Sequence, residues 1–151
     1  MITKELSDAY YGTDYIIFME DENLVLGALG QSARLESLMK EDGVSTCAYI
    51  TAYSPDSKVV SPDENTRNQK ALIADISSKH WKYYNGEGKH PSNNWPAEPS
   101  ILIMGIKLKE ARDLALRYRQ IAFLFGTSGG KTKLIATNEK EQHKLEHPSP
   151  C

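Results

Sequence analysis

The sequence has few cysteines, no long apolar run and little net charge, and each absence excludes a class of protein. Cys47 opens an expected strand and Cys151 is the last residue, so two free thiols in a reducing compartment are favoured over a disulfide. The longest apolar runs, at residues 16–19 and 101–104, are far too short to span a membrane. The first residues contain no apolar segment of the signal-peptide kind. These absences predict a soluble cytoplasmic protein with no membrane partner.

A nearly balanced charge argues against a protein dedicated to nucleic acid. Lys plus Arg number 18 and Asp plus Glu number 20, giving a net charge of −2, whereas nucleic-acid binders usually carry a basic excess. Hydrophobic residues make up 40% and charged residues 25% of the 151 residues, which is ordinary for one globular domain. A chain of this length buries roughly 68–70% of its unfolded surface, so it needs neither metal nor disulfide for stability.

Hydrophobic periodicity and turn residues predict an alternation of short strands and amphipathic helices. Strands are expected at residues 15–19, 24–26, 47–53, 81–84, 100–105, 121–125 and 131–136, and helices at residues 32–43, 61–79 and 107–119. From Cys47 onward the order is strand, helix, strand, strand, helix, strand, which is typical of an α+β fold with a ferredoxin-like split βαβ core (βαββαβ). The N-terminal β-hairpin and helix and the extra C-terminal strand would be additions to it. A different mixed α+β sheet is the alternative. Residues 1–136 are expected to form a single domain and residues 137–151 a polar, flexible tail.

The start of the helix at residue 61 is the clearest local signal. Ser61 is suited to cap the helix, Pro62 fits its first position, and Glu64 completes a capping box. Extending the apolar stripe of this helix backwards by helical spacing reaches Asn68 and Asn65. Polar amides therefore occupy positions where the pattern predicts apolar side chains. They serve either a ligand, together with Arg67, or the neighbouring loop.

A long segment at residues 85–99 reads as a loop, and loops of this length are usually functional or disordered. Trp95 within it indicates order. Glu87 and Glu98 flank it, and two acids in this arrangement suit general acid–base chemistry or a cation. The alternative is that Glu98 fixes the loop by accepting backbone N–H bonds or pairs with Arg67.

Other patterns point away from phosphate and metal sites. The run from Gly126 to Lys131 fails the phosphate-loop spacing, and a strand follows it, so a Gly129-Gly130 hairpin turn is favoured. His143 and His147 have helical metal-ligand spacing but no third ligand in register. We therefore expect no metal and no cofactor.

Four short segments carry a resemblance to a known family: Thr51-Ala52-Tyr53-Ser54-Pro55, Glu64-Asn65-Thr66-Arg67, Trp95-Pro96-Ala97-Glu98-Pro99-Ser100 and Gln120-Ile121-Ala122. They resemble the motifs TA-x-N-P, E-N-x-x-R, W-x-E-P-S and Q-A-I of a bacterial domain-of-unknown-function family, number 3293. The similarity spans about residues 24–135. Ser54 stands where the family usually has Asn, and Gln120-Ile121-Ala122 inverts the last two residues. The first difference weakens any role of that amide, and the resemblance brings no activity with it.

Three functions compete. The first is binding of a small polar or anionic ligand in a cleft where strands end and a helix starts, with or without catalysis. Its candidate residues are Thr51, Tyr53, Asn65, Arg67, Asn68, Glu87, Trp95, Glu98, Ser100 and Gln120. The second is a non-catalytic interaction or regulatory module. The third, disfavoured by the net charge, is single-stranded nucleic-acid binding by Tyr49, Thr51 and Tyr53 on an open sheet face. The sequence identifies no catalytic residue and no oligomeric state.

Overall fold

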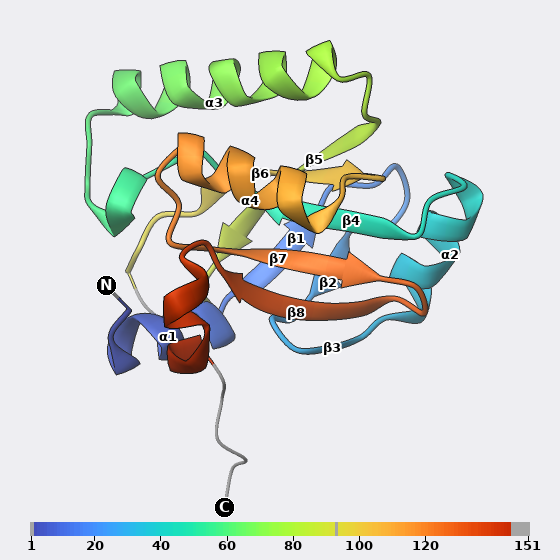
Figure 1. The fold of residues 1–151 in the computed structure, drawn as a ribbon, viewed down its shortest axis with the longest axis horizontal. Helices are drawn as coiled ribbons and strands as arrows, with labels where there is room; N and C mark the ends of the chain where they lie inside the picture. Colours follow the sequence, from blue (N-terminus) through green and yellow to red (C-terminus); the bar gives the residue numbers. More distant parts are fainter. Residues whose placement is uncertain (1, 93, 146–151) are drawn as a thin grey trace, which may run out of the picture.

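The computed structural model describes residues 2–92 and 94–145 and shows one sheet of eight strands (Figure 1). The strands are β1 (Asp14–Ile17), β2 (Leu24–Leu26), β3 (Gly30–Gln31), β4 (Thr46–Ile50), β5 (Tyr83–Lys89), β6 (Glu98–Met104), β7 (Ala122–Thr127) and β8 (Lys131–Ala136). Their order across the sheet is β2-β1-β5-β6-β4-β7-β8-β3, and every neighbouring pair is antiparallel.

The helices begin where the sequence supplies a cap. They are α1 (Lys4–Tyr11), α2 (Ala33–Glu41), α3 (Pro62–Ser78) and α4 (Leu108–Arg117), with 3-10 segments η1 (Pro55–Ser57) and η2 (Glu139–Leu145). The predicted caps of α2 and α3 are confirmed, because the hydroxyls of Ser32 and Ser61 each accept a backbone N–H bond of 3.1 Å. Pro62 opens α3 as predicted.

The sheet curls until its two edges nearly meet. The edge strands β2 and β3 are separated only by residues 27–29, so their ends lie at most roughly 14 Å apart. The hydroxyl of Thr132 on β8 donates to the carbonyl of Gly27 at 3.0 Å, next to β2. Leu24 and Leu26 of β2 share one buried cluster with Leu134 of β8. The result is a nearly closed, barrel-like sheet.

The two faces of the sheet bury different cores. The inner face carries Tyr49, Leu102 and Leu124, and α2 adds Leu35 and Met39 to the same cluster. The outer face is covered by α3 and α4, as Figure 1 shows. This outer core contains alternate residues of the same strands together with helix residues: Ala48, Ile50, Leu72, Ile76, Ile101, Ile103, Ala115 and Phe123. Period-two alternation in β4, β6 and β7 therefore serves two cores.

The predicted ferredoxin-like fold with additions is wrong. The N-terminal hairpin is not an appendage, because β1 pairs with β5 from Asp14 to Ile17, and β8 and β3 extend the opposite side. The strands form one eight-stranded antiparallel sheet that bends around an interior core. Pairing of β1 with β5 joins segments about seventy residues apart, and local periodicity does not encode such pairing.

The segment expected as a long loop is mostly strand. β5 continues through Asn85, Gly86 and Gly88 to Lys89, and β6 begins at Glu98. The described part of the expected tail is also packed. In η2 the side chain of Leu145 is 1% exposed, and the Glu141 carboxylate accepts the N–H of Ile2 at 2.9 Å. Figure 1 shows α1 and η2 side by side.

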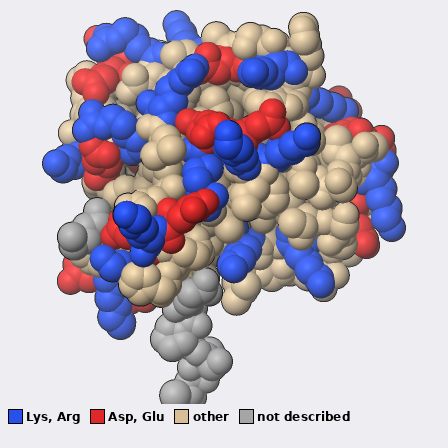
Figure 2. All heavy atoms as spheres, viewed as in Figure 1, with Lys and Arg blue, Asp and Glu red and all other residues tan. Residues whose placement is uncertain are grey.

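Three further sequence-based expectations concern the cysteines, a membrane span and the surface charge. Cys47 is a free, buried cysteine, while Cys151 and His147 lie outside the described residues. No helix among residues 2–92 and 94–145 has the length and apolarity needed to cross a membrane. On the face drawn in Figure 2, Lys and Arg are interspersed with Asp and Glu over α3 and α4. That face therefore presents no continuous basic surface.

Candidate functional site

A cavity of about 240 Å³ opens at the end of the barrel next to α1. Three parts of the chain build it. Leu6, Ala9 and Tyr10 of α1 form one wall, and strand residues of the inner face form the floor: Tyr15, Tyr49, Gly88, Ser100, Ala122, Leu124 and Leu134. Residues after β4 and before β6 form the rim: Thr51, Ser54, Ser57, Trp95 and Glu98, with Gln120 beside them. Its volume is below the roughly 300–1,000 Å³ of drug-sized sites, so it suits a small molecule.

The rim loop after β4 has an unusual backbone. Ser54, Asp56 and Ser57 have positive φ angles of 50°, 57° and 58°. Side chains with a Cβ rarely adopt this left-handed region, and each such residue costs about 1–3 kcal/mol. Ser54 and Ser57 both line the cavity. Strain of this kind persists only where surrounding contacts enforce it, and it concentrates at functional sites.

Four side chains hold this loop in place. Asn65 accepts the N–H of Ser54 at 2.9 Å, and Gln120 donates to the carbonyl of Tyr53 at 3.0 Å. Glu98 accepts the hydroxyl of Ser54 at 2.7 Å. Arg119 pairs with the Asp56 carboxylate, and its carbonyl accepts the N–H of Asp56. The loop is therefore fixed from α3, from the start of β6 and from the turn before β7.

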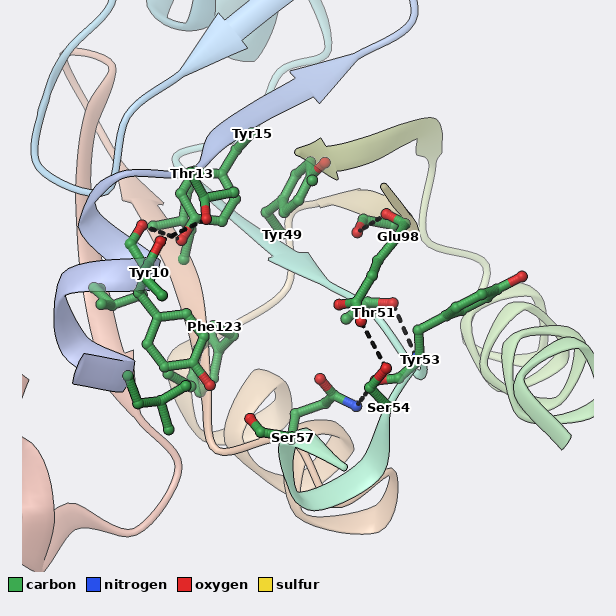
Figure 3. A pocket seen from close by; sticks show the side chains of 18 of the residues that line it. Tyr10, Thr13, Tyr15, Tyr49, Thr51, Tyr53, Ser54, Ser57, Glu98 and Phe123 are labelled. Atoms are coloured by element: carbon green, nitrogen blue, oxygen red, sulfur yellow. Dashed lines mark hydrogen bonds between the residues drawn. The ribbon is translucent and has the colours of Figure 1, made fainter. Parts of the chain in front are cut away.

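The rim is tied to β6 by a second group of bonds. Thr51 donates to the carbonyl of Pro99 at 2.6 Å and accepts the N–H of Tyr53 at 3.0 Å. The indole N–H of Trp95 donates to Glu98 at 2.9 Å. Figure 3 shows Glu98, Thr51 and Ser54 together on one side of the cavity, with Tyr10 facing them from α1. One carboxylate thus joins the two rim segments.

The segments that carry the family resemblance meet at this rim. The family model described as "Protein of unknown function (DUF3293)" matches residues 50–123. Residues 50–123 are therefore similar to the DUF3293 family, and we call them the DUF3293 segment. No curated protein and no solved structure matches the chain. The DUF3293 segment supplies the rim loop and its supports, whereas the α1 wall and Tyr15 come from outside the matched residues.

The structure separates the predicted site residues into two groups. Six of them line the cavity within the DUF3293 segment: Thr51, Tyr53, Trp95, Glu98, Ser100 and Gln120. Asn65, Arg67, Asn68 and Glu87 are not among its lining residues. Asn65 serves the loop, Arg67 is exposed, Asn68 is half-buried on α3, and Glu87 lies in β5 opposite Ile16. A shared cleft of Arg67, Asn65 and Glu98 is therefore absent from the described structure.

Sequence reasoning missed the wall formed by α1. Thr3 caps this helix, and Leu6, Ala9 and Tyr10 follow at the spacing that places them on one helical face. That signal is present in the sequence, but the polar composition and the tyrosine cluster at residues 10–15 obscure it. Tyr15 was also missed, and Tyr49 was predicted on an open sheet face, because the burial of both depends on closure of the barrel. Their rings meet edge to face, with centroids 5.5 Å apart.

The buried phenols give the protein a predictable response to alkaline pH. Burial raises the pKa of Tyr10 to about 12; a contact with the Ser57 hydroxyl lowers it and the negative charge of Glu98 raises it. Burial also raises the pKa of Tyr15 and of Tyr49. An unfolded tyrosine titrates near 10.0. The folded state therefore holds these protons more tightly than the unfolded state. The stabilisation from Tyr10 is complete below pH 10 and is lost as pH rises through 12.

We accordingly expect the free energy of unfolding to fall steeply above about pH 10. Chemical denaturation across this range, combined with near-ultraviolet titration of phenolate, measures both effects. Tyr10→Phe should show a shallower decline than the wild type. Free ionisation of all tyrosines near pH 10 in the folded protein would contradict the burial described.

Proposed function

We propose that the protein binds a small polar molecule in the barrel-end cavity. The observation that carries this proposal is the strained rim loop, which several hydrogen bonds hold beside the open space of the cavity. Asn65, Glu98 and Gln120 all form hydrogen bonds that hold Ser54 and its neighbours in place. A loop that served only to connect β4 with α3 would not need left-handed serines facing a cavity.

The charge of the cavity indicates which ligand charge it favours. Among the described lining residues Glu98 carries the single carboxylate, and none of them is Lys or Arg. Arg67, the cation on which an anionic ligand would depend, is exposed elsewhere on α3. A neutral or cationic polar ligand therefore fits better than an anion.

The competing functions receive less support. Nucleic-acid binding required Tyr49 on an open sheet face, but Tyr49 is 5% exposed and its hydroxyl donates to the Ile16 carbonyl inside the barrel. An interaction module requires that the polar rim residues be satisfied internally. Asn65, Thr51 and Ser100 meet that requirement. The Oε1 atom of Glu98 has no partner among the described residues, and Glu98 and Ser57 both face the cavity (Figure 3). The buried free thiol of Cys47 accords with action in the reducing cytoplasm.

Filling the cavity tests the proposal. Gly88 lies on the inner face of β5, and a Cβ added there meets only the Thr13 methyl, at 3.7 Å. Gly88→Leu should therefore fold and occupy part of the cavity. We expect ligand affinity to fall about tenfold or more, because the added side chain replaces ligand volume. A fragment screen by ligand-observed NMR supplies the ligands and the measurement.

Gly30→Leu is the matched control. Gly30 also lies in a strand, and a Cβ there meets nothing within 4 Å. This variant should keep full affinity. Equal binding by Gly88→Leu and the wild type would place the ligand elsewhere and refute the proposal.

A further inference from the structure

The hydrogen-bond donors around the cavity are almost all used within the protein. The hydroxyls of Tyr15 and Tyr49 donate to the carbonyls of Tyr10 and Ile16 at 2.7 and 3.0 Å. The hydroxyl of Thr13 donates to the Ala9 carbonyl at 2.7 Å. None of these protons remains for a ligand.

The rim shows the same pattern. Thr51 and Ser100 donate to backbone carbonyls, at 2.6 and 2.9 Å. Both protons of the Gln120 amide are used, one on the Tyr53 carbonyl at 3.0 Å and one on the Tyr118 carbonyl at 3.1 Å. Ser54 and Trp95 both donate to Glu98. Of the described lining side chains, only the hydroxyls of Tyr10, Ser57 and Tyr53 remain as donors. Tyr10 and Ser57 contact each other, and the Tyr53 ring points away from the cavity in Figure 3.

Acceptors, by contrast, remain open. Both bonds to the Glu98 carboxylate end on Oε2, at 2.7 and 2.9 Å, and Oε1 has no partner among the described residues. The Oε1 atom of Gln120 is likewise unpartnered within the described chain. A carboxylate can accept about four hydrogen bonds, so Glu98 retains capacity for a ligand. A ligand that complements this cavity therefore supplies hydrogen-bond donors.

The charge and the aromatic rings of the cavity also favour a ligand with a positively charged donor group. Glu98 is negative, and its field reaches across the cavity, since it acts on the Tyr10 phenol. Tyr15 and Tyr49 are fixed at right angles, with an interplanar angle of 82°. Rings of this kind attract cations when the charge lies within about 6 Å of the ring centroid. Figure 3 shows Tyr10, Tyr15 and Tyr49 around the side of the cavity that faces Glu98.

We propose that the ligand class is a monocationic amine on a small apolar or aromatic body, with its ammonium group bound by Glu98 and the tyrosine walls. An ammonium supplies several donors to a site that offers acceptors, and its charge compensates the carboxylate. The apolar body fits the Leu6, Ala9 and Leu124 surfaces. This inference rests on the proposed function of the cavity.

The test uses matched ligand triplets. Each triplet places an aminomethyl, hydroxymethyl or carboxylate group on the same ring, as in benzylamine, benzyl alcohol and benzoate. Ligand-observed NMR titrations up to millimolar concentration are run with the wild type, Glu98→Gln and Glu41→Gln. Glutamine keeps a carbonyl oxygen that accepts the Ser54 and Trp95 bonds, and Glu41→Gln removes the same charge from an exposed position at the end of α2, outside the cavity lining.

We expect the amines to bind more tightly than their alcohols and acids. Glu98→Gln should weaken amine binding about tenfold or more, and Glu41→Gln should leave it unchanged. A preference for alcohols or carboxylates that Gly88→Leu abolishes would overturn the amine assignment and leave the proposed function standing. No binding in any arm would overturn both. The comparison of the three arms on the wild type decides the ligand class even where Glu98→Gln fails to fold.

Discussion

Gly86→Ala is expected to lower the free energy of unfolding by about 3 kcal/mol or more, although it adds a single methyl group. A Cβ on Gly86 would overlap the backbone carbonyl oxygen of Ile16 and crowd the Cα of Ile17. Both belong to β1, which pairs with β5 at this point. Backbone cannot move aside as a flexible side chain can, so the two strands would have to separate. Urea denaturation with circular dichroism measures the loss.

Gly88→Ala is the control for this experiment. Gly88 lies two residues further along β5 and on the same face, but a Cβ there meets only the Thr13 methyl at ordinary distance, 3.7 Å. It should change stability by less than about 1 kcal/mol. Equal effects at the two glycines would mean that β1 and β5 do not approach as closely as described.

Asn65→Ala is expected to cost about 1–3 kcal/mol and to release the rim loop. Asn65 accepts the N–H of Ser54, and without it that N–H is left unsatisfied beside left-handed serines. The cavity rim should then lose its fixed shape, so ligand affinity falls together with stability. Thermal denaturation and amide hydrogen exchange at residues 54–57 measure the two effects.

Asn68→Ala provides the comparison on the same helix. Asn68 follows Asn65 by three residues, which is about one helical turn. It is half-buried and makes no hydrogen bond with another described residue. Its replacement by Ala, a better helix former, should be close to neutral. If Asn68→Ala were as damaging as Asn65→Ala, support of the loop by Asn65 would not explain the effect.

Local signals in the sequence predicted local structure well. The caps at Ser32 and Ser61 and the glycine turn before β8 follow from side-chain and backbone chemistry within a few residues. Closure of the sheet does not follow from such signals. Gly86 and Gly88 suggested a loop because glycine usually interrupts strands, whereas here Gly86 permits the close approach of β1 and Gly88 lines the cavity.

The candidate site was predictable only where it depends on local signals in the sequence. Thr51, Glu98 and Gln120 could be placed near one another because they stand at the ends of expected elements. The tyrosine wall could not, because Tyr10 reaches the cavity only through packing of α1 over the barrel end. Asn65 was correctly singled out as anomalous. Its hydrogen bond shows that it supports the loop, although ligand binding would still depend on it.

The contact between α1 and η2 has a consequence for the order of folding. The bond from Ile2 to Glu141 joins residues 139 positions apart, and the Tyr11 hydroxyl reaches the Leu145 carbonyl across 134. Contacts of such sequence separation carry a large entropic cost of closure and form late. We therefore expect the wall that completes the cavity to form after the more local strand pairs. A ligand in the cavity would bind only a chain in which this wall has formed. Its binding energy would therefore add to the stability of the whole barrel rather than to that of the DUF3293 segment alone.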